Sequence, residues 1–286
     1  MEFYLVTTDH FTDRIWFKDD QDFRVAMNII AVLSFKTGIP ILAFILMSNH
    51  VHFVLQCSIN EAKMFIDELK TRYGQYLNIR YGTKEFLRRN KVDYQRLLIE
   101  DESLHKGLAY TVMNCVAANI CLNAMEYPWG SGGVYFRAAP PRGRMIGELS
   151  PRAQMILIHS KTMLPKDMIL GEDGYILPDS FVAVKFVEDL FGSPKRMNYF
   201  LVNSSKAKRR IEARKNGLPS FKDQVIYAAI PDLCRSIFLK RFEDLTRDEK
   251  VELTLQIKRR FSADVAQIAR VIGMPYSEVA SMVDSF

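Results

Sequence analysis

The chain has 286 residues, 48% of them hydrophobic and 25% charged, which are ordinary globular proportions. Its length exceeds that of a typical domain of roughly 100 to 200 residues, so we expect two structural units. The formal net charge of +6 favours a polyanionic partner.

Several protein classes are excluded by the same totals. The longest apolar runs, such as ILAFILM, fall short of the roughly 20 residues that a membrane helix needs. The N-terminus lacks the basic start and apolar run of a signal peptide. The four cysteines have no zinc-ribbon spacing and suggest reduced, mostly buried thiols. We therefore expect a cytoplasmic protein with no membrane segment.

The first half of the chain alternates strand and helix patterns. We expect strands at 3–8, within 41–56 as a pair, and at about 93–99, and helices at 19–36, about 60–80 and about 102–123. This order is that of an α+β, ferredoxin-like split βαβ fold with an antiparallel sheet and one extra helix. The first two helices should cover one face of the sheet, and the extra helix can lie across the other.

The second half of the chain is expected to be helical. Glycines and prolines interrupt the pattern after residue 123. We expect a first, α+β domain at 1–136, a linker at 137–150, and an all-helical, basic domain at 151–286.

The last forty residues have a helix-turn-helix pattern at 246–286. Thr246 is a good N-cap, and Ala269, Gly273 and Val279 stand at the small, turn and apolar positions of that motif. The same pattern also fits a plain helical hairpin, so base reading by this unit is left open.

Two histidines suggest a metal site in the second strand of the pair. His50 and His52 are two residues apart, so their side chains should project from one face of the strand. Neutral imidazole is a common ligand for divalent metals, but two ligands are too few to hold an ion. His10 follows the first strand, where an ordinary turn residue is the simpler interpretation and an approach to the site is the alternative.

The extra helix supplies a candidate third ligand and a candidate nucleophile. Tyr110 and Asn114 are four residues apart and therefore share one helical face. If this helix crosses the open face of the sheet, Asn114 can offer its carbonyl oxygen to the ion held by the histidines. Tyr110 would then face whatever the metal polarises. Such a site keeps open coordination positions, as catalysis requires.

Three motifs together resemble the single-tyrosine HUH transposases, especially the REP-associated tyrosine transposases: MSNHVHFVL, YTVMNCVAANI and EYPWGS. The resemblance covers roughly residues 3–136 and extends to the early FKDDQDF segment. It implies that His50, His52 and Asn114 bind a divalent ion and that Tyr110 is the catalytic nucleophile. Family members usually continue the tyrosine helix as Asn-Pro-Val-Arg-Ala-Gly. Here the proline and the arginine are missing, so DNA contacts at the end of that helix are not carried over.

The implied activity is the cutting and rejoining of single-stranded or hairpin DNA through a 5′-phosphotyrosine. Histidine nitrogens favour Mn²⁺ over Mg²⁺, although the cellular abundance of Mg²⁺ keeps it a candidate. Two other classes stay open: a domesticated, non-cutting DNA-binding regulator, and a metal-dependent hydrolase of small phosphoesters. The sequence also leaves open whether the chain works as a monomer or as a homodimer.

Basic residues are concentrated toward the C-terminus. Residues 195–270 carry 18 Lys or Arg against 9 Asp or Glu. Candidate phosphate contacts, with solvated helix surfaces as the alternative, are Lys84, Arg88, Arg89, Lys91, Lys206, Lys208, Arg209 and Arg210. The aromatic residues Tyr127 and Trp129 are interpreted as anchors for the loop after the tyrosine helix rather than as base-stacking platforms.

Overall fold

The computed structural model describes residues 2–84, 87–118, 120–204 and 221–284. The fold divides into two compact units, each discontinuous in sequence. The first comprises residues 1–9, 20–46 and 51–209, and the second comprises residues 10–19, 47–50 and 210–286.

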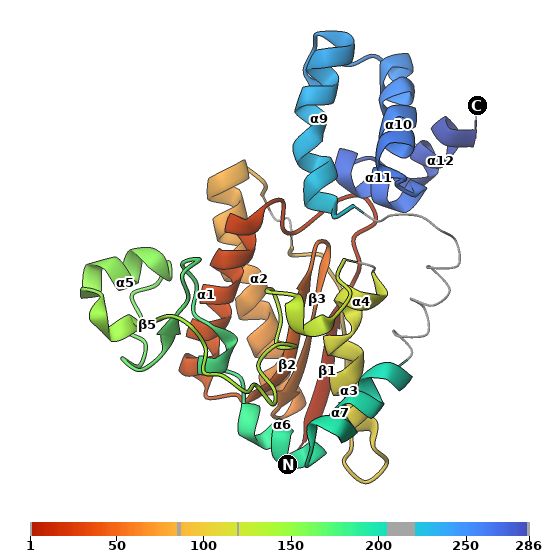
Figure 1. The fold of residues 1–286 in the computed structure, drawn as a ribbon. Coiled ribbons are helices and arrows are strands. Elements are labelled where there is room, and N and C mark those ends of the chain that lie inside the picture. Colours follow the sequence, from red (N-terminus) through yellow and green to blue (C-terminus); the bar gives the residue numbers. More distant parts are fainter. Residues whose placement is uncertain (1, 85–86, 119, 205–220, 285–286) are drawn as a thin grey trace. The chain divides into compact units, whose positions relative to one another are not determined.

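The first unit is built on a four-stranded antiparallel sheet. Its strands are β1 (Phe3–Thr8), β2 (Ile41–Met47), β3 (His50–Gln56) and β4 (Val92–Leu97), in the order β2-β3-β1-β4 (Figure 1). The central strand β1 pairs with both β3 and β4, and its register places Thr7 opposite His52. The α+β class and the antiparallel sheet expected from the sequence are therefore confirmed.

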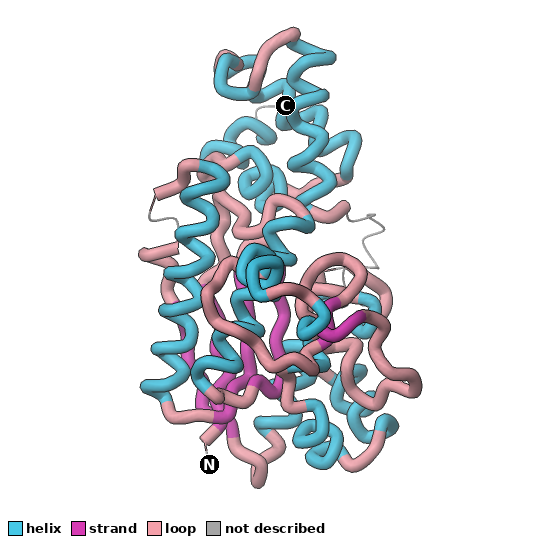
Figure 2. Tube along the Cα trace, turned by 90° about the vertical axis from the view of Figure 1, so that its left-hand side faces the viewer, coloured by secondary structure: helices cyan, strands magenta, loops and turns pink. Residues whose placement is uncertain are grey.

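Two long helices, α1 (Asp20–Thr37) and α2 (Ile59–Tyr81), lie together beside the sheet (Figure 2). The ring of Phe53 in β3 lies 5.4 Å from that of Phe65 in α2, so α2 packs on the face to which Phe53 points. A capping box between Ser58 and Glu61 starts α2. Gly82 ends it in the left-handed conformation that suits glycine.

The tyrosine helix approaches the sheet from the face that carries His52. Helix α3 (Ser103–Val112) comes close to β4, because a Cβ atom on Gly107 would lie only 2.7 Å from Leu97 Cδ1. Glycine therefore allows this approach. The ring of Tyr110 reaches that of His52 at 5.5 Å. His52 and Phe53 are adjacent in β3 and point to opposite faces, so α3 and α2 cover different faces of the sheet.

The expected single helix over 102–123 is corrected by the structure. Helix α3 ends at Val112, Met113 is a turn residue, and a short helix α4 spans Asn114–Ala117. The side-chain amide of Asn114 donates to the carbonyls of Tyr110 and Thr111. An asparagine that bonds to preceding carbonyls competes with the helical backbone ladder, which explains the break.

The segment from 124 to 204 belongs to the first unit. Around Trp129 the chain pairs with the edge of β2, and the Trp129 ring stacks on Phe23 at 4.9 Å. Tyr127 donates its hydroxyl to the carbonyl of Leu46, so the anchoring roles expected for these two aromatics are confirmed. The expected linker 137–150 instead contains regular structure. The elements of this segment are η1 (Ala124–Glu126), β5 (Arg144–Met145), η2 (Ile146–Glu148), α5 (Pro151–Leu157), β6 (Ile169–Leu170), η3 (Pro178–Ser180), α6 (Val184–Phe191) and α7 (Pro194–Asn203).

The second unit contains the C-terminal helices. These are α9 (Asp223–Phe238), η4 (Phe242–Asp244), α10 (Arg247–Phe261), α11 (Val265–Ile272) and α12 (Tyr276–Asp284). Thr246 caps α10 through a capping box, and Gly273 ends α11 at a φ of 71°. Ala269 and Val279 are fully buried, as the helix-turn-helix pattern requires. None of the helices in the described ranges combines the length and apolar character that crossing a membrane requires.

The anchoring of α3 by His105 generates a testable pH dependence. His105 stacks on Phe200 of α7 at 5.0 Å, and its Nε2 lies 3.3 Å from the carbonyl oxygen of Leu190. Burial lowers the pKa of His105 below its ordinary value of 6.5. The unfolded chain therefore binds this proton more readily, so the free energy of unfolding should fall as the pH drops below 6.5.

We expect His105→Phe to make that fall shallower than in the wild type. Urea unfolding followed at pH 7.5 and at pH 5.5 measures it. Identical differences between the two pH values in both proteins would show that His105 does not contribute to the pH dependence.

Candidate metal centre

The histidine pair lies at the start of β3, where the structure gives each ring a fixed hydrogen-bonding partner. His52 is fully buried, and its Nδ1 lies 2.9 Å from Thr7 Oγ1 on the neighbouring strand. His50 is 5% exposed, and its Nδ1 lies 2.8 Å from Asn49 Oδ1. Partners of this kind orient imidazoles for metal binding by occupying one ring nitrogen.

The orientation of Asn49 determines the tautomer of His50. The Asn49 amide nitrogen donates to the carbonyl of Phe11 at 2.6 Å, so its Oδ1 must be the atom that faces His50. A carbonyl oxygen only accepts hydrogen bonds, and therefore His50 Nδ1 carries the proton in the neutral ring. The lone pair then resides on Nε2, which is the form that a metal ligand requires.

His10 completes a cluster of three imidazoles. Its ring stacks on that of His50, with centroids 3.5 Å apart and planes 24° apart. One nitrogen from each of His10, His50 and His52 lies within 4.8 Å of the other two, with His10 exposed and the others buried. The expectation that a divalent metal can be held here is supported in this coarser form, and the third imidazole comes from the residue interpreted first as an ordinary turn residue.

The nitrogens of the cluster would have to move closer together to share one ion. Three imidazole nitrogens that each lie about 2.1 Å from one ion are about 3.4 Å apart in a tetrahedral arrangement. Nitrogens within 4.8 Å of one another would therefore need to close by up to about 1.4 Å. The exposed ring of His10 is the one that can move, because β3 holds the other two.

Tyr110 lies beside the cluster. Its ring stands perpendicular to that of His52, at 88° and with centroids 5.5 Å apart. The tyrosine is partly exposed, whereas His52 is buried. The Tyr110 ring is therefore next to the histidine cluster and partly accessible to solvent.

Asn114 stays a predicted ligand. Its side chain is buried, and the amide nitrogen is used on the carbonyls of Tyr110 and Thr111. Those bonds leave the carbonyl oxygen, the atom that would reach a metal, with acceptor capacity. Because α4 begins at Asn114, this residue and Tyr110 do not lie on one continuous helix as the spacing predicted.

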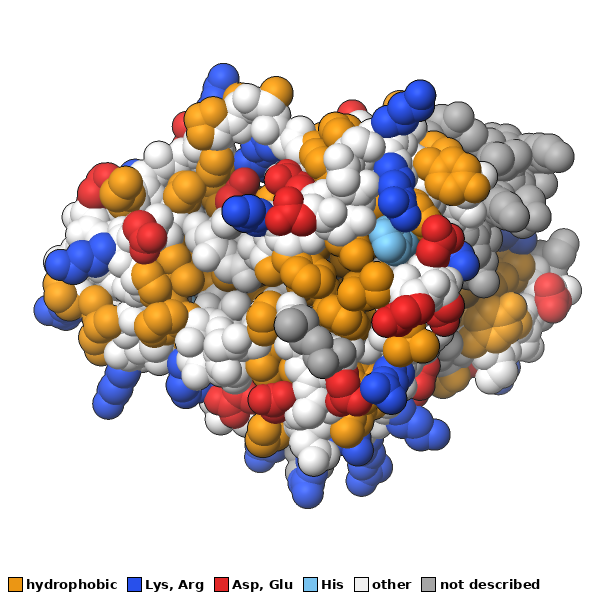
Figure 3. Space-filling model, turned by 90° about the horizontal axis from the view of Figure 1, so that it is seen from below, with side chains coloured by type: hydrophobic (Ala, Val, Ile, Leu, Met, Phe, Trp, Pro, Cys, Tyr) orange, Lys and Arg blue, Asp and Glu red, His pale blue; other side chains and the backbone are white. Residues whose placement is uncertain are grey.

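The basic side chains predicted to guide DNA fall into two groups. Lys84, Arg88, Arg89 and Lys91 are exposed. The backbone beside them adjoins the residue before His10, because Asp9 donates to the carbonyl of Lys91 at 2.8 Å and accepts from the Asn90 amide at 2.9 Å. Lys206, Lys208, Arg209 and Arg210 lie outside the described residues. On the face seen in Figure 3, basic and acidic side chains are interspersed rather than separated.

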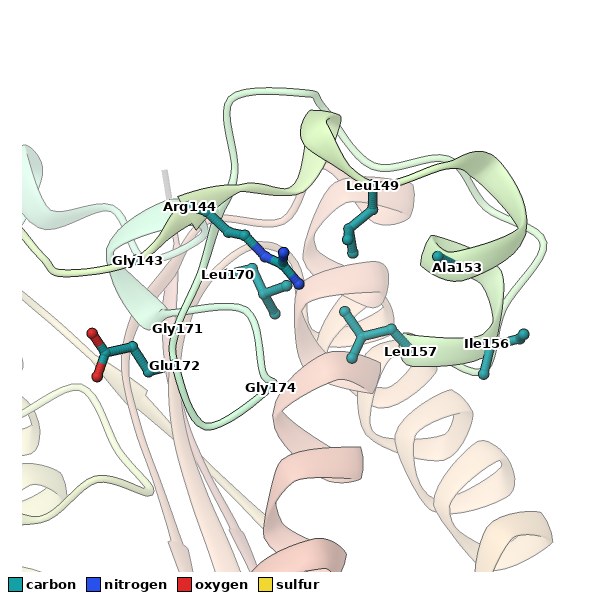
Figure 4. A pocket seen from close by; sticks show the side chains of 10 residues that line it. All are labelled: Gly143, Arg144, Leu149, Ala153, Ile156, Leu157, Leu170, Gly171, Glu172 and Gly174. Atoms are coloured by element: carbon teal, nitrogen blue, oxygen red, sulfur yellow. The ribbon is translucent and has the colours of Figure 1, made fainter.

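A pocket of about 780 Å³ forms a second candidate site in the first unit (Figure 4). Its walls are mainly aliphatic, with Leu149, Leu157 and Leu170, and the Arg144 side chain points into it while Glu172 points away. Asn28 of α1 holds two of its walls by donating to the carbonyls of Leu157 and Gly174. Among the described residues that line the pocket, none has a hydroxyl, thiol or imidazole, and the only carboxylate, that of Glu172, points away.

Comparisons with protein-family models, curated proteins and solved structures give no match to this chain. Any functional assignment therefore rests on the residues and the geometry described above.

Removal of His10 tests the cluster directly. We expect His10→Ala to weaken Mn²⁺ binding more than tenfold, because loss of a ligand should cost at least as much as loss of an outer partner, about 10- to 100-fold. Isothermal titration of the full chain with MnCl₂ measures the affinity. The exposed His159, changed to Asn, is the matched control and should bind Mn²⁺ as the wild type does. Equal affinities for His10→Ala and the wild type would exclude His10 as a ligand.

Proposed function

We propose that this protein is a metal-dependent tyrosine transposase or endonuclease that cuts and rejoins single-stranded or hairpin DNA. The observation that carries the proposal is the perpendicular contact of Tyr110 with His52, one member of the three-histidine cluster. Tyr110 is on a helix, α3, and His52 is on a strand, β3. A tyrosine beside a candidate metal site is the arrangement that covalent phosphoryl transfer by a tyrosine needs.

The residues of the chain divide the chemistry between them. A divalent ion, when bound, supplies Lewis-acid polarisation of the scissile phosphate, and Mn²⁺ suits an imidazole-rich donor set better than Mg²⁺ does. His10, His50 and His52 would hold that ion, with Asn114 as a further candidate. Tyr110 would be the nucleophile, positioned by the close approach of α3 to β4 at Gly107 and by the packing of His105 against α7.

The cleavage step conserves both protons and bond energy. The Tyr110 oxygen forms a bond to phosphorus as the bond from phosphorus to the 3′ oxygen breaks. The phenol loses one proton, and the departing 3′ oxygen gains one. A 3′-hydroxyl on the same or another strand can reverse the step, because the phosphotyrosine bond retains the energy of the phosphodiester. Joining therefore needs no nucleoside triphosphate.

The sheet order and the placement of helices support the finer description of the first unit as a ferredoxin-like fold. The order β2-β3-β1-β4 with two helices beside one face is compatible with that fold, and α3 is the additional helix. The exposed Arg88, Arg89 and Lys91, next to the segment that leads into His10, would guide a strand toward the site.

The C-terminal unit gives less support to base-specific reading of DNA. Helix α12 stands in the position of a recognition helix. Its exposed side chains are Tyr276, Ser277, Glu278, Ser281 and Asp284, with no lysine or arginine. Such a surface suits contacts with phosphates poorly.

Substitution of the nucleophile is the first test. We expect Tyr110→Phe to abolish the covalent adduct formed with single-stranded hairpin DNA and Mn²⁺, while binding of the DNA is retained. Adduct formation is followed by a shift of the protein band on a denaturing gel. The control is Tyr94→Phe in β4, because burial and the charge of Asp67 raise the pKa of Tyr94 to about 12 and make its phenol a poor nucleophile.

Two outcomes would contradict the proposal. Binding of hairpin DNA without any adduct in the wild type would identify a non-cutting regulator. Hydrolysis of a small phosphodiester that survives Tyr110→Phe would identify a metal-dependent hydrolase instead.

The role of the basic segment has its own test. Affinity for DNA falls as salt rises, and each phosphate contact with a single strand contributes about −0.7 to the slope of log affinity against log salt. We expect the double variant Arg88→Ala and Arg89→Ala to make this negative slope shallower by about 1.4. Fluorescence anisotropy between 50 and 300 mM NaCl measures the slope. Arg152→Ala, an exposed arginine at the start of α5, should leave it unchanged. An unaltered slope in the double variant would mean that these arginines do not contact DNA phosphates.

A further inference from the structure

A buried carboxylate at the start of α9 joins three separate segments of the second unit. Asp223 is 6% exposed and accepts hydrogen bonds from the Ser48 hydroxyl at 2.6 Å, from the Gln267 amide at 2.9 Å and from Arg270 Nε at 3.1 Å. A second Arg270 nitrogen, Nη2, lies 3.3 Å from the same carboxylate. A buried charge is tolerated only with several such donors, so this arrangement fixes the position of the carboxylate.

The Ser48 hydroxyl belongs to the turn from which His50 emerges. The carbonyl of Ser48 accepts from the backbone N–H groups of Trp16 and Phe17, at 2.7 and 3.2 Å. The next residue, Asn49, orients His50 through the bond between its Oδ1 and the imidazole Nδ1. The backbone of the turn is thus held by residues 16 and 17, and its Ser48 side chain is held by Asp223. Because Ser48 is only two residues before His50, a displacement of Ser48 would also shift His50.

The segment that contributes His10 is held by the same helix. The side chain of Gln224, the residue after Asp223, donates to the carbonyl of Phe17 at 2.8 Å. The Lys18 ammonium lies 5.5 Å from the centre of the Tyr227 ring, one turn further along α9. Residues 10–19 and 47–50 accordingly belong to the compact unit formed by the C-terminal helices.

We propose that Asp223 is a positioning residue for the metal centre, because its carboxylate, oriented by Gln267 and Arg270, holds the Ser48–Asn49 turn and thereby sets the position of His50. The proposal rests on the metal binding assigned to the three histidines. It gives α9 and α11 a function that does not depend on reading DNA bases. The metal affinity would then depend on the hydrogen bond between Ser48 and Asp223, which are 175 positions apart in the sequence.

Two substitutions remove the central hydrogen bond from opposite ends. We expect Asp223→Asn and Ser48→Ala each to weaken Mn²⁺ binding by the full chain about tenfold, the lower end of the roughly 10- to 100-fold loss that removing a direct partner of a metal ligand causes. The double variant should bind no more weakly than the weaker single variant, since both changes delete the same contact. Ser48→Thr keeps a hydroxyl and should retain most of the affinity. Asp232→Asn is the matched control, because that carboxylate is on the same helix and is 84% exposed.

A spectroscopic measurement separates positioning from simple stapling of the fold. Co²⁺ replaces Mn²⁺ at saturating concentration, and its visible absorption reports the geometry of the ligands. We expect the band positions or intensities to change in Asp223→Asn and Ser48→Ala and to match the wild type in Ser48→Thr and Asp232→Asn. Thermal unfolding without metal is recorded in parallel, and all titrations are made well below the lowest melting temperature.

The outcomes distinguish this proposal from the function on which it rests. Mn²⁺ binding by the wild type together with equal affinity and an identical Co²⁺ spectrum in Asp223→Asn would overturn the positioning role alone, even if the variant unfolds at a lower temperature. Absence of Mn²⁺ binding in the wild type would overturn the metal centre and this role with it. The positioning role would be supported if Asp223→Asn and Ser48→Ala both bind Mn²⁺ more weakly than the wild type and Ser48→Thr retains most of the wild-type affinity.

Discussion

The antiparallel register between β1 and β3 is the constraint on which the candidate site depends. Thr7 lies opposite His52, so the last residues of β1 and the first residues of β3 are side by side at one end of these two strands. The chain leaving β1 therefore passes the first residues of β3, and His10 stacks on His50 there. Thr7 also provides the partner of His52 Nδ1. One pairing of strands thus orients one candidate ligand, His52, and brings another, His10, beside it.

The features of this site that depend on the periodicity of a short stretch of sequence could be predicted. Alternation along a strand predicted the shared face of His50 and His52, and helical periodicity predicted a helix that carries Tyr110. His10 was undervalued because its position depends on which strand neighbours β1. That information was implicit in the expected fold, since the ferredoxin-like order places the first strand beside the third. The break at Met113 was missed because an asparagine side chain that bonds to carbonyls of the preceding helix leaves no mark in hydrophobic spacing.

Asp223 illustrates a residue that sequence reasoning cannot find. An aspartate in the first turn of a helix is ordinarily explained by the positive end of the helix dipole. Only the fold shows that its carboxylate is shared by Ser48, Gln267 and Arg270. The basic excess in this half of the chain suggested phosphate contacts, yet Arg270 is paired with a buried acid and α12 exposes no basic side chain. The charge of Arg270 is therefore satisfied within the protein, and net charge alone does not identify phosphate contacts.

The discontinuity of the second unit has a consequence for synthesis of the protein. Residues 10–19 and 47–50 leave the ribosome early, but the helices that hold them begin at residue 223. Domains form as the chain emerges, so the sheet can assemble while the Ser48–Asn49 turn still lacks its partner. A nascent chain would then carry the three-histidine cluster without the contact that fixes the Ser48–Asn49 turn. The candidate metal site would be completed only after α9, which begins at residue 223, has been made.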